Sequence, residues 1–112
     1  MITNYLWGII VEYYAMLFLK LKAYKILYHR YKTYVGELDL ITYKNDSLIF
    51  IEVKYRSNQD IINYAIQPQQ IKRICRAAEL FISHHPIYAN CNIRFDVLLI
   101  NRLSINHIQN VW

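Results

Sequence analysis

GELDLITYKNDSLIFIEVK, residues 36–54, consists of two apolar runs on either side of the polar turn KNDS. Asn and Asp tolerate the left-handed backbone of tight turns, so the stretch predicts an antiparallel hairpin centred on Asn45 and Asp46. In that register Asp39 faces Glu52 directly across the two strands. The apolar pattern therefore carries two carboxylates to one place in the predicted sheet.

The same register sorts the hairpin side chains into a polar and an apolar face. Because side chains alternate along a strand, Glu37, Asp39, Glu52 and Lys54 project from one face, and Glu37 lies opposite Lys54. The other face is expected to be a core surface and carries Leu38, Leu40, Ile49, Ile51 and Val53.

The facing carboxylates predict a cation site. Directly opposed strand residues have Cβ atoms about 4.5–5.5 Å apart, and like charges placed there are destabilising. Asp39 and Glu52 therefore favour a hard divalent ion with oxygen ligands, Mg²⁺ or Mn²⁺. Lys54, two residues beyond Glu52 on the same face, would orient or deprotonate a water or stabilise charge on a phosphate. Glu-x-Lys also occurs by chance on amphipathic strands, but the register favours the functional interpretation. Asp followed by Glu-x-Lys is the metal-site pattern of the PD-(D/E)xK nucleases.

The composition agrees with a polyanionic partner. The 112 residues include 13 Lys or Arg against 8 Asp or Glu, a formal net charge of +5. Such charge favours phosphate binding, although charge alone does not separate nucleic-acid-binding proteins from other basic proteins. Cys75 and Cys91 show no CxxC spacing, which favours free thiols and a reduced, cytoplasmic setting.

The N-terminal apolar run, residues 5–19, is interrupted by Glu12. A charged side chain at the centre of a membrane helix costs about 2.5–3.5 kcal/mol, and the run is shorter than the ~20 residues that span a bilayer. The positively charged start of a signal peptide is absent as well, since no Lys or Arg precedes Lys20. We expect a helix buried on most of its sides, with no membrane association.

Hydrophobic spacing predicts an α-β-β-β-α-β order within one domain, residues 1–112. A proline is favoured in the first helical turn, so the second helix is expected to begin at Pro68, and Pro86 closes it. Helices at both ends of a mixed sheet indicate a layered α/β domain. The first helix is expected at residues 3–22, and the strands at residues 23–33, 37–43, 48–55 and 93–100, with a short last strand at 105–109.

Five motifs follow one another along the chain: GELDLI (36–41), FIEVKYR (50–56), a basic helix led by Pro68, RFDV (94–97) and HIQNVW (107–112). In this order they resemble the bacterial YraN (UPF0102) family, which is related to archaeal Holliday-junction resolvases within the PD-(D/E)xK nuclease superfamily. The resemblance spans nearly the whole chain. It implies a restriction-endonuclease-like α/β fold, a mixed sheet flanked by helices, with the active site at the hairpin.

The resemblance also implies roles for individual residues. Asp39 and Glu52 correspond to the metal-binding carboxylates and Lys54 to the catalytic lysine. Glu12 corresponds to a helix glutamate that reaches the metal or a metal-bound water; a salt bridge or a solvent-facing position is the alternative for this residue. Glu37 would form an ion pair that positions Lys54.

The start of the second helix differs from the family pattern, and basic residues nearby are candidates for phosphate binding. Family members carry Lys-Gln at the start of the second helix, where this chain has Gln70-Ile71, so Gln70 is a candidate supporting residue. The candidate phosphate-binding residues are Arg56, Lys72, Arg73 and Arg76. For the last three, a plain solvated helix face is the alternative.

The sequence thus predicts a Mg²⁺- or Mn²⁺-dependent endonuclease that hydrolyses phosphodiester bonds in DNA, with branched DNA among the candidate substrates. The first alternative is a nucleic-acid-binding module with a residual, non-catalytic nuclease fold. A second is an interaction domain that uses the surface of its 11 tyrosines. A homodimer would suit two symmetrical cuts, but the sequence shows no interface signature.

Overall fold

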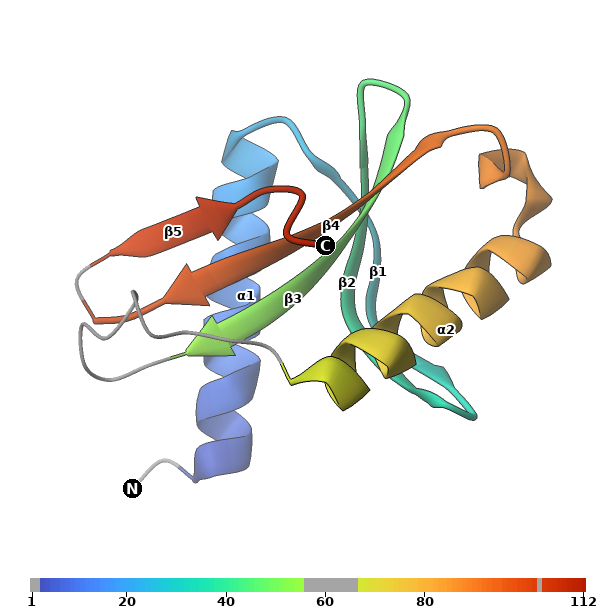
Figure 1. Ribbon diagram of the computed structural model, residues 1–112. Coiled ribbons are helices and arrows are strands. Elements are labelled where there is room, and N and C mark those ends of the chain that lie inside the picture. The colour runs from blue at the N-terminus through green and yellow to red at the C-terminus, as the bar shows by residue number, and fades with distance from the viewer. Residues whose placement is uncertain (1–2, 56–66, 103) are drawn as a thin grey trace.

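The computed structural model describes residues 3–55, 67–102 and 104–112, which form one five-stranded sheet with a long helix on each side (Figure 1). The strand order is β1-β2-β3-β4-β5, with β3 and β4 parallel and every other pair antiparallel. The predicted order and the mixed sheet are confirmed. The bounds are α1 Asn4–Leu21, β1 Lys25–Thr33, β2 Gly36–Lys44, β3 Ser47–Tyr55, α2 Pro68–His84, the 3₁₀ turn η1 Pro86–Tyr88, β4 Asn92–Ile100 and β5 Ile105–Ile108.

The hairpin of β2 and β3 has the predicted register. Asn45 and Asp46 both adopt positive φ, 51° and 61°, as a tight two-residue turn requires. The backbone ladder runs from the turn to the pair formed by Leu40 and Ile51. Beyond Leu40, the described part of β2 pairs only with β1, as far as Gly36. The strands β2 and β3 therefore separate at the position of Asp39.

Both faces of the sheet are buried, where the sequence predicted one apolar face on the hairpin. On one face α1 packs against a core that includes Leu40, Ile49 and Ile51. On the other, α2 packs against a second core that includes Leu38 and Phe50. The prediction that Leu38 shares the face of Leu40 is wrong. The pairs of β1 and β2 on either side of this point are His29 with Leu40 and Tyr31 with Leu38, and Arg30 between them has φ of 57°, so regular alternation stops here.

Helix α1 is buried along one side only, through Val11, Ala15, Met16 and Leu19. Its first turn is closed by Thr3, whose Oγ1 accepts a hydrogen bond from the Leu6 N–H. The expectation of a helix buried on most sides is wrong, because among the described elements the sheet covers just one of its faces. No helix in the described part of the chain combines the length and apolar character needed to cross a membrane.

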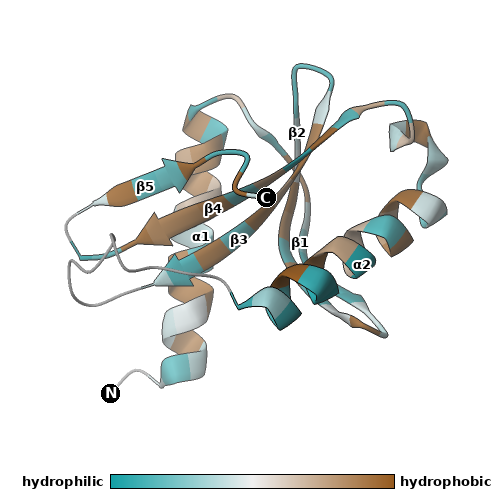
Figure 2. Cartoon of the chain, in the orientation of Figure 1, coloured by the Kyte–Doolittle hydropathy of each residue, from teal (hydrophilic) through white to brown (hydrophobic). Residues whose placement is uncertain are grey.

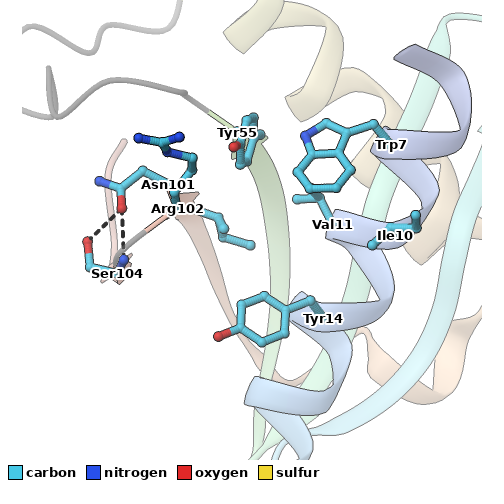
Figure 3. A pocket seen from close by; sticks show the side chains of 9 residues that line it. Trp7, Ile10, Val11, Tyr14, Tyr55, Asn101, Arg102 and Ser104 are labelled. Atoms are coloured by element: carbon cyan, nitrogen blue, oxygen red, sulfur yellow. Dashed lines mark hydrogen bonds between the residues drawn. The ribbon is translucent and has the colours of Figure 1, made fainter. Parts of the chain in front are cut away.

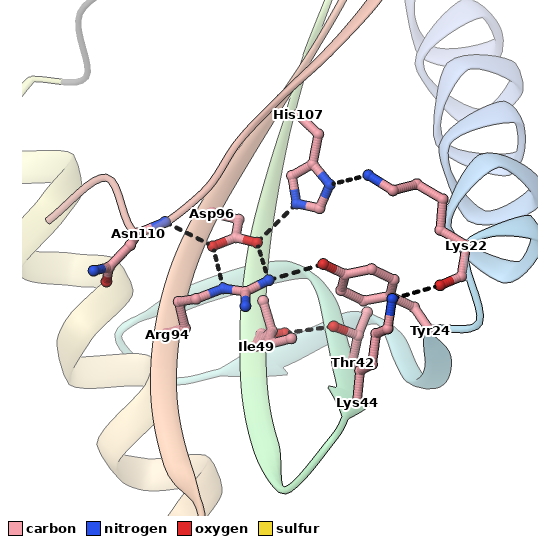
Figure 4. Close-up of polar contacts among 9 residues, drawn as sticks. All are labelled: Lys22, Tyr24, Thr42, Lys44, Ile49, Arg94, Asp96, His107 and Asn110. Atoms are coloured by element: carbon pink, nitrogen blue, oxygen red, sulfur yellow. Dashed lines mark hydrogen bonds and ion pairs between the residues drawn. The ribbon is translucent and has the colours of Figure 1, made fainter.

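A buried carboxylate joins the end of α1 to the far edge of the sheet (Figure 4). Asp96 on β4 accepts hydrogen bonds from Arg94, from Nε2 of His107 and from the backbone N–H of Asn110, at 2.7–2.9 Å. Nζ of Lys22 donates to Nδ1 of the same His107 over 3.1 Å. Burial raises the pKa of Asp96, but the hydrogen bonds from His107 and Arg94 outweigh it and lower that pKa overall. Arg94 and Asp96, two residues apart on β4, thus form an ion pair.

Candidate active site

Asp39 lies where β2 and β3 part, and its side chain joins the two strands. The backbone N–H of Val53 on β3 donates to Asp39 Oδ2 over 2.9 Å. The carboxylate thus takes the place of a backbone acceptor at the point where the ladder ends. Glu52, the residue before Val53, is buried in the middle of the sheet. The separation of the strands therefore makes room for two carboxylates inside the fold.

The two carboxylates perturb each other strongly. Burial, and after it the charge of Glu52 and a hydrogen bond to the Glu52 side chain, together raise the pKa of Asp39 to about 8, and the Val53 N–H only partly offsets them. In the folded chain Asp39 therefore keeps its proton at neutral pH. Two close carboxylates cannot both be charged unless a cation compensates them. A metal cation that displaces the proton of Asp39 would allow both carboxylates to be charged.

Two donors from different elements hold Glu52 in place. Nζ of Lys54 lies 2.9 Å from Glu52 Oε2, and Nε2 of Gln70, in the first turn of α2, donates to the same oxygen over 2.5 Å. The structure thus brings Lys54 and Gln70, both candidates from the sequence, against Glu52, and their functional roles stay predictions. The expected ion pair of Glu37 with Lys54 is not formed, because β2 pairs with β1 at Glu37, opposite Lys32, and leaves β3 before that point. Glu37 is exposed.

Glu12 on α1 binds two residues of β1 that the sequence did not single out. Its Oε1 is 2.6 Å from Nε2 of His29 and 2.8 Å from Nε of Arg30. Neighbouring residues of a regular strand point to opposite faces, but the left-handed backbone of Arg30 brings both side chains to the same carboxylate. The salt-bridge alternative for Glu12 is thus realised. The charge of Glu12 also makes a small contribution to the raised pKa of Asp39, and its metal role stays a prediction.

The basic residues of α2 form an exposed face beside the carboxylates. Lys72, Arg73 and Arg76 are all exposed. Arg73 packs over Gly36 at the start of β2, where a Cβ added to Gly36 would lie 2.7 Å from Arg73 Cδ. That contact places Arg73 at the same end of β2 as Asp39. The fourth candidate, Arg56, lies outside the described residues.

A small cavity lies against the carboxylate pair. Its volume is about 10 Å³, close to the space that one water molecule needs. It is lined by Asp39 and Glu52, by core residues of the hairpin, and by Ile74 and Trp112. Within the described part of the chain, Nε1 of Trp112 is buried without a hydrogen-bond partner. A buried N–H donor without a partner is rare, so Trp112 is a residue of interest that the sequence did not indicate.

The donor set fits a hard divalent cation. Mg²⁺ is commonly bound by one or two carboxylates and keeps several of its waters, and Asp39 and Glu52 supply two. Among the residues that the structure describes, no third His, Cys, Asp or Glu joins them in a cluster. The remaining positions around an ion would therefore fall to a backbone carbonyl of the strands and to water.

The strand order, the flanking helices and the carboxylates at the point where β2 and β3 part define the class. This is an α/β protein with a restriction-endonuclease-like core.

Within that class, the chain belongs to the uncharacterised protein family UPF0102, whose model matches residues 11–100. It is 41% identical over 106 residues to a UPF0102 protein of Ehrlichia ruminantium, an alignment covering 94% of this chain and 82% of the relative. A UPF0102 protein of Rhodopseudomonas palustris is 42% identical, with 83% and 72% covered. One of Parvibaculum lavamentivorans is 37% identical, with 99% and 84% covered.

Proposed function

We propose that the protein is a metal-dependent endonuclease that hydrolyses phosphodiester bonds in DNA. The observation that carries this proposal is the pair formed by half-buried Asp39 and buried Glu52. Desolvation and mutual repulsion raise the pKa of Asp39 to about 8, and the ammonium of Lys54 lies beside the pair. Strongly perturbed groups with a specific charge partner are typical of functional sites. The family membership is compatible with the proposal but does not itself carry an activity.

Each residue has a distinct part in the proposed reaction. Hydrolysis forms a bond from a water oxygen to phosphorus and breaks one P–O ester bond, leaving a phosphomonoester and a hydroxyl. A divalent cation bound by Asp39 and Glu52 would supply charge neutralisation of the phosphate and acidify a water. Lys54 would orient the attacking water and stabilise the negative charge that develops on phosphorus-bound oxygens. Gln70, hydrogen-bonded to Glu52, would hold that carboxylate in position.

The charge distribution supports a nucleic-acid substrate. The exposed basic face of α2, which includes Lys72, Arg73 and Arg76, lies beside the proposed site, and the chain carries a formal charge of +5. Phosphate neutralisation by such residues makes binding salt-dependent. A duplex or a branched junction would place its backbone against this face.

A non-catalytic nucleic-acid-binding module is the second candidate. Lys54 and Gln70 both engage the same oxygen of Glu52, and the described residues provide no third ligand of the usual types beside the pair. Under this alternative the polar residues stabilise a buried carboxylate, and the basic face alone carries the function. Binding of DNA would then survive the loss of Asp39.

The experiment that separates the two is cleavage of a labelled panel of duplex, single strand, flap and four-way junction in the presence of Mg²⁺ or Mn²⁺. We expect cleavage by the wild type, and none by Asp39→Asn or Lys54→Ala, because each substitution removes one essential group. Glu79→Gln removes an exposed carboxylate elsewhere on α2 and serves as the matched control, with unchanged activity.

Retained cleavage in Asp39→Asn would contradict the assignment of this residue. Absence of cleavage by all four proteins, together with retained salt-dependent binding of DNA, would favour the non-catalytic module. Circular dichroism and thermal unfolding of each variant would establish that lost cleavage is not lost folding.

A further inference from the structure

The outward side of α1 is an apolar surface that is largely exposed, although Trp7 contacts Tyr55 of β3 and Tyr13 contacts His29 of β1 at its margins. Seven large apolar side chains project from it, and their exposed fractions run from 38% for Trp7 to 81% for Leu21. Figure 2 shows the contrast with α2: α1 is brown and pale over most of its length, whereas α2 alternates between brown and teal. The outward side chains are Leu6, Trp7, Ile10, Tyr13, Tyr14, Leu17 and Leu21; we call them the α1 outer face.

The spacing of the outer face is that of a helix-packing seam. Trp7, Ile10, Tyr14, Leu17 and Leu21 follow one another at intervals of three, four, three and four residues, the heptad repeat that keeps one stripe facing a partner helix. The opposite side of the helix already packs on the sheet. A helix that is apolar all round is normally buried on all sides.

The size of the outer face matches half of a protein interface. Each partner contributes about 800 Å² to a standard interface, and seven neighbouring large apolar residues with exposed fractions of 38–81% supply an area of that order. The largest apolar patch of a typical monomer is about 300–600 Å². The face is therefore of the size that a stable partner requires.

The charges of α1 favour a protein partner over a lipid surface. Helices that lie on membranes carry several Lys and Arg on their polar side. Within α1 the charged residues are Glu12 and Lys20 alone, and Glu12 is engaged by His29 and Arg30 on the inward side. The partner surface is therefore expected to be a helix with apolar side chains at heptad intervals. The α1 outer face of a second copy is such a surface.

We propose that the α1 outer face is the interface of a homodimer, in which α1 packs against α1 of a second copy across a two-fold axis. A two-fold interface is self-complementary, so one apolar stripe suffices for both partners. An antiparallel arrangement keeps the two Lys20 ammonium groups apart and places Tyr14 near the axis.

A hollow at the edge of the stripe would accept side chains of the second copy (Figure 3). It measures about 390 Å³ and is lined by Trp7, Ile10 and Tyr14 of the outer face together with Tyr55, Arg102 and four other residues. This inference rests on the shape of α1 and does not depend on the proposed nuclease activity.

Sedimentation velocity of the whole chain at micromolar concentration tests the interface. The wild type is expected to sediment as a dimer. Leu17→Glu places a charge within the seam, one heptad step from Tyr14, and is expected to raise the dimer dissociation constant roughly 30-fold or more, as loss of an interface hot spot does. Ile87→Glu is the matched control, because Ile87 is 82% exposed on η1, outside the outer face, and this variant should remain dimeric.

A wild type that is monomeric at every concentration would overturn the proposal, as would dissociation constants of Leu17→Glu and wild type that agree. Tyr14→Glu is the second variant if Leu17→Glu loses its thermal unfolding transition. Co-sedimentation of a monomeric wild type with anionic phospholipid vesicles would also overturn the proposal and assign the face to a lipid surface.

Discussion

Asp39 concentrates the unusual chemistry of this protein in one side chain. It lies half-buried where two strands part, accepts a hydrogen bond from Val53, and shares its surroundings with Glu52. A carboxyl group in this position destabilises the fold when it ionises. Carboxyl groups with strongly perturbed pKa values are typical of functional sites. The neighbouring carboxylate of Glu52 suggests that the function of this site is cation binding.

The pH dependence of stability follows from the raised pKa. Unfolded Asp39 loses its proton near its ordinary pKa of 3.8, whereas folded Asp39 keeps it up to about 8. Between these values the folded chain holds the extra proton, so this residue's contribution to the free energy of unfolding falls as pH rises and is lost above 8. Asp39→Asn has no charge to bury, and its side-chain oxygen can still accept from Val53.

We therefore expect Asp39→Asn, in EDTA, to be more stable than the wild type at pH 9 by more than about 1 kcal/mol, the equivalent of roughly one pKa unit. At pH 4 the two should agree closely. Urea unfolding at the two pH values measures the difference, with Glu79→Gln as the control. An equal loss of stability between pH 4 and pH 9 in wild type and Asp39→Asn would refute the raised pKa.

Single residues also mark the limit of what the sequence predicts. Asp39, Glu52, Lys54 and Gln70 were found from spacing and resemblance, and the structure brings them together. The binding of Glu12 by His29 and Arg30 was not foreseen, because it depends on one left-handed residue inside a strand. Sequence periodicity assumes regular alternation and cannot show where alternation stops.

At the scale of the elements, the hairpin of β2 and β3 was predictable because a two-residue turn sets the register of everything that follows it. The departure of β2 from β3 was not, since the apolar pattern continues through it. This departure explains why the expected Glu37–Lys54 pair is absent and why Leu38 packs under α2. Helix α2 begins at Pro68 as expected, and its buried residues are Ile74, Ala77, Ala78 and Phe81.

The turn into β2 depends on Gly36, which combines φ of +151° with the close approach of Arg73. Gly36→Ala is expected to lower the free energy of unfolding by about 1–3 kcal/mol, because both the backbone and the Arg73 contact are strained. Denaturation in urea checks this.

Gly8→Ala provides the opposite control, since nothing lies within 4 Å of a Cβ at this helical position; it should stabilise by about 0.5–1 kcal/mol. In the double variant with Arg73→Ala, the side-chain clash is gone and the backbone strain remains, so part of the loss should persist. A Gly36→Ala protein as stable as wild type would show that neither constraint matters.

At the scale of the whole molecule, the sheet separates two surfaces with different properties. On the side of α2 lie the exposed basic residues and the donor Gln70 that reaches the carboxylates. On the side of α1 lies the apolar outer face. The order of elements and the mixed sheet could be read from the sequence, because they follow from local periodicity. The exposure of α1 could not be predicted, because an apolar sequence has the same pattern whether its own chain or another chain covers it.

The most direct test of the central claim, that Asp39 and Glu52 form a divalent-cation site, is calorimetric titration of Mn²⁺ or Mg²⁺ into the metal-free protein. It should be run at pH 7 in two buffers with different protonation enthalpies. We predict binding by the wild type with release of about one proton per cation, because Asp39 must give up its proton to become a ligand. Asp39→Asn should not bind. Absence of binding by the wild type, or equal binding by wild type and Asp39→Asn, would contradict the account.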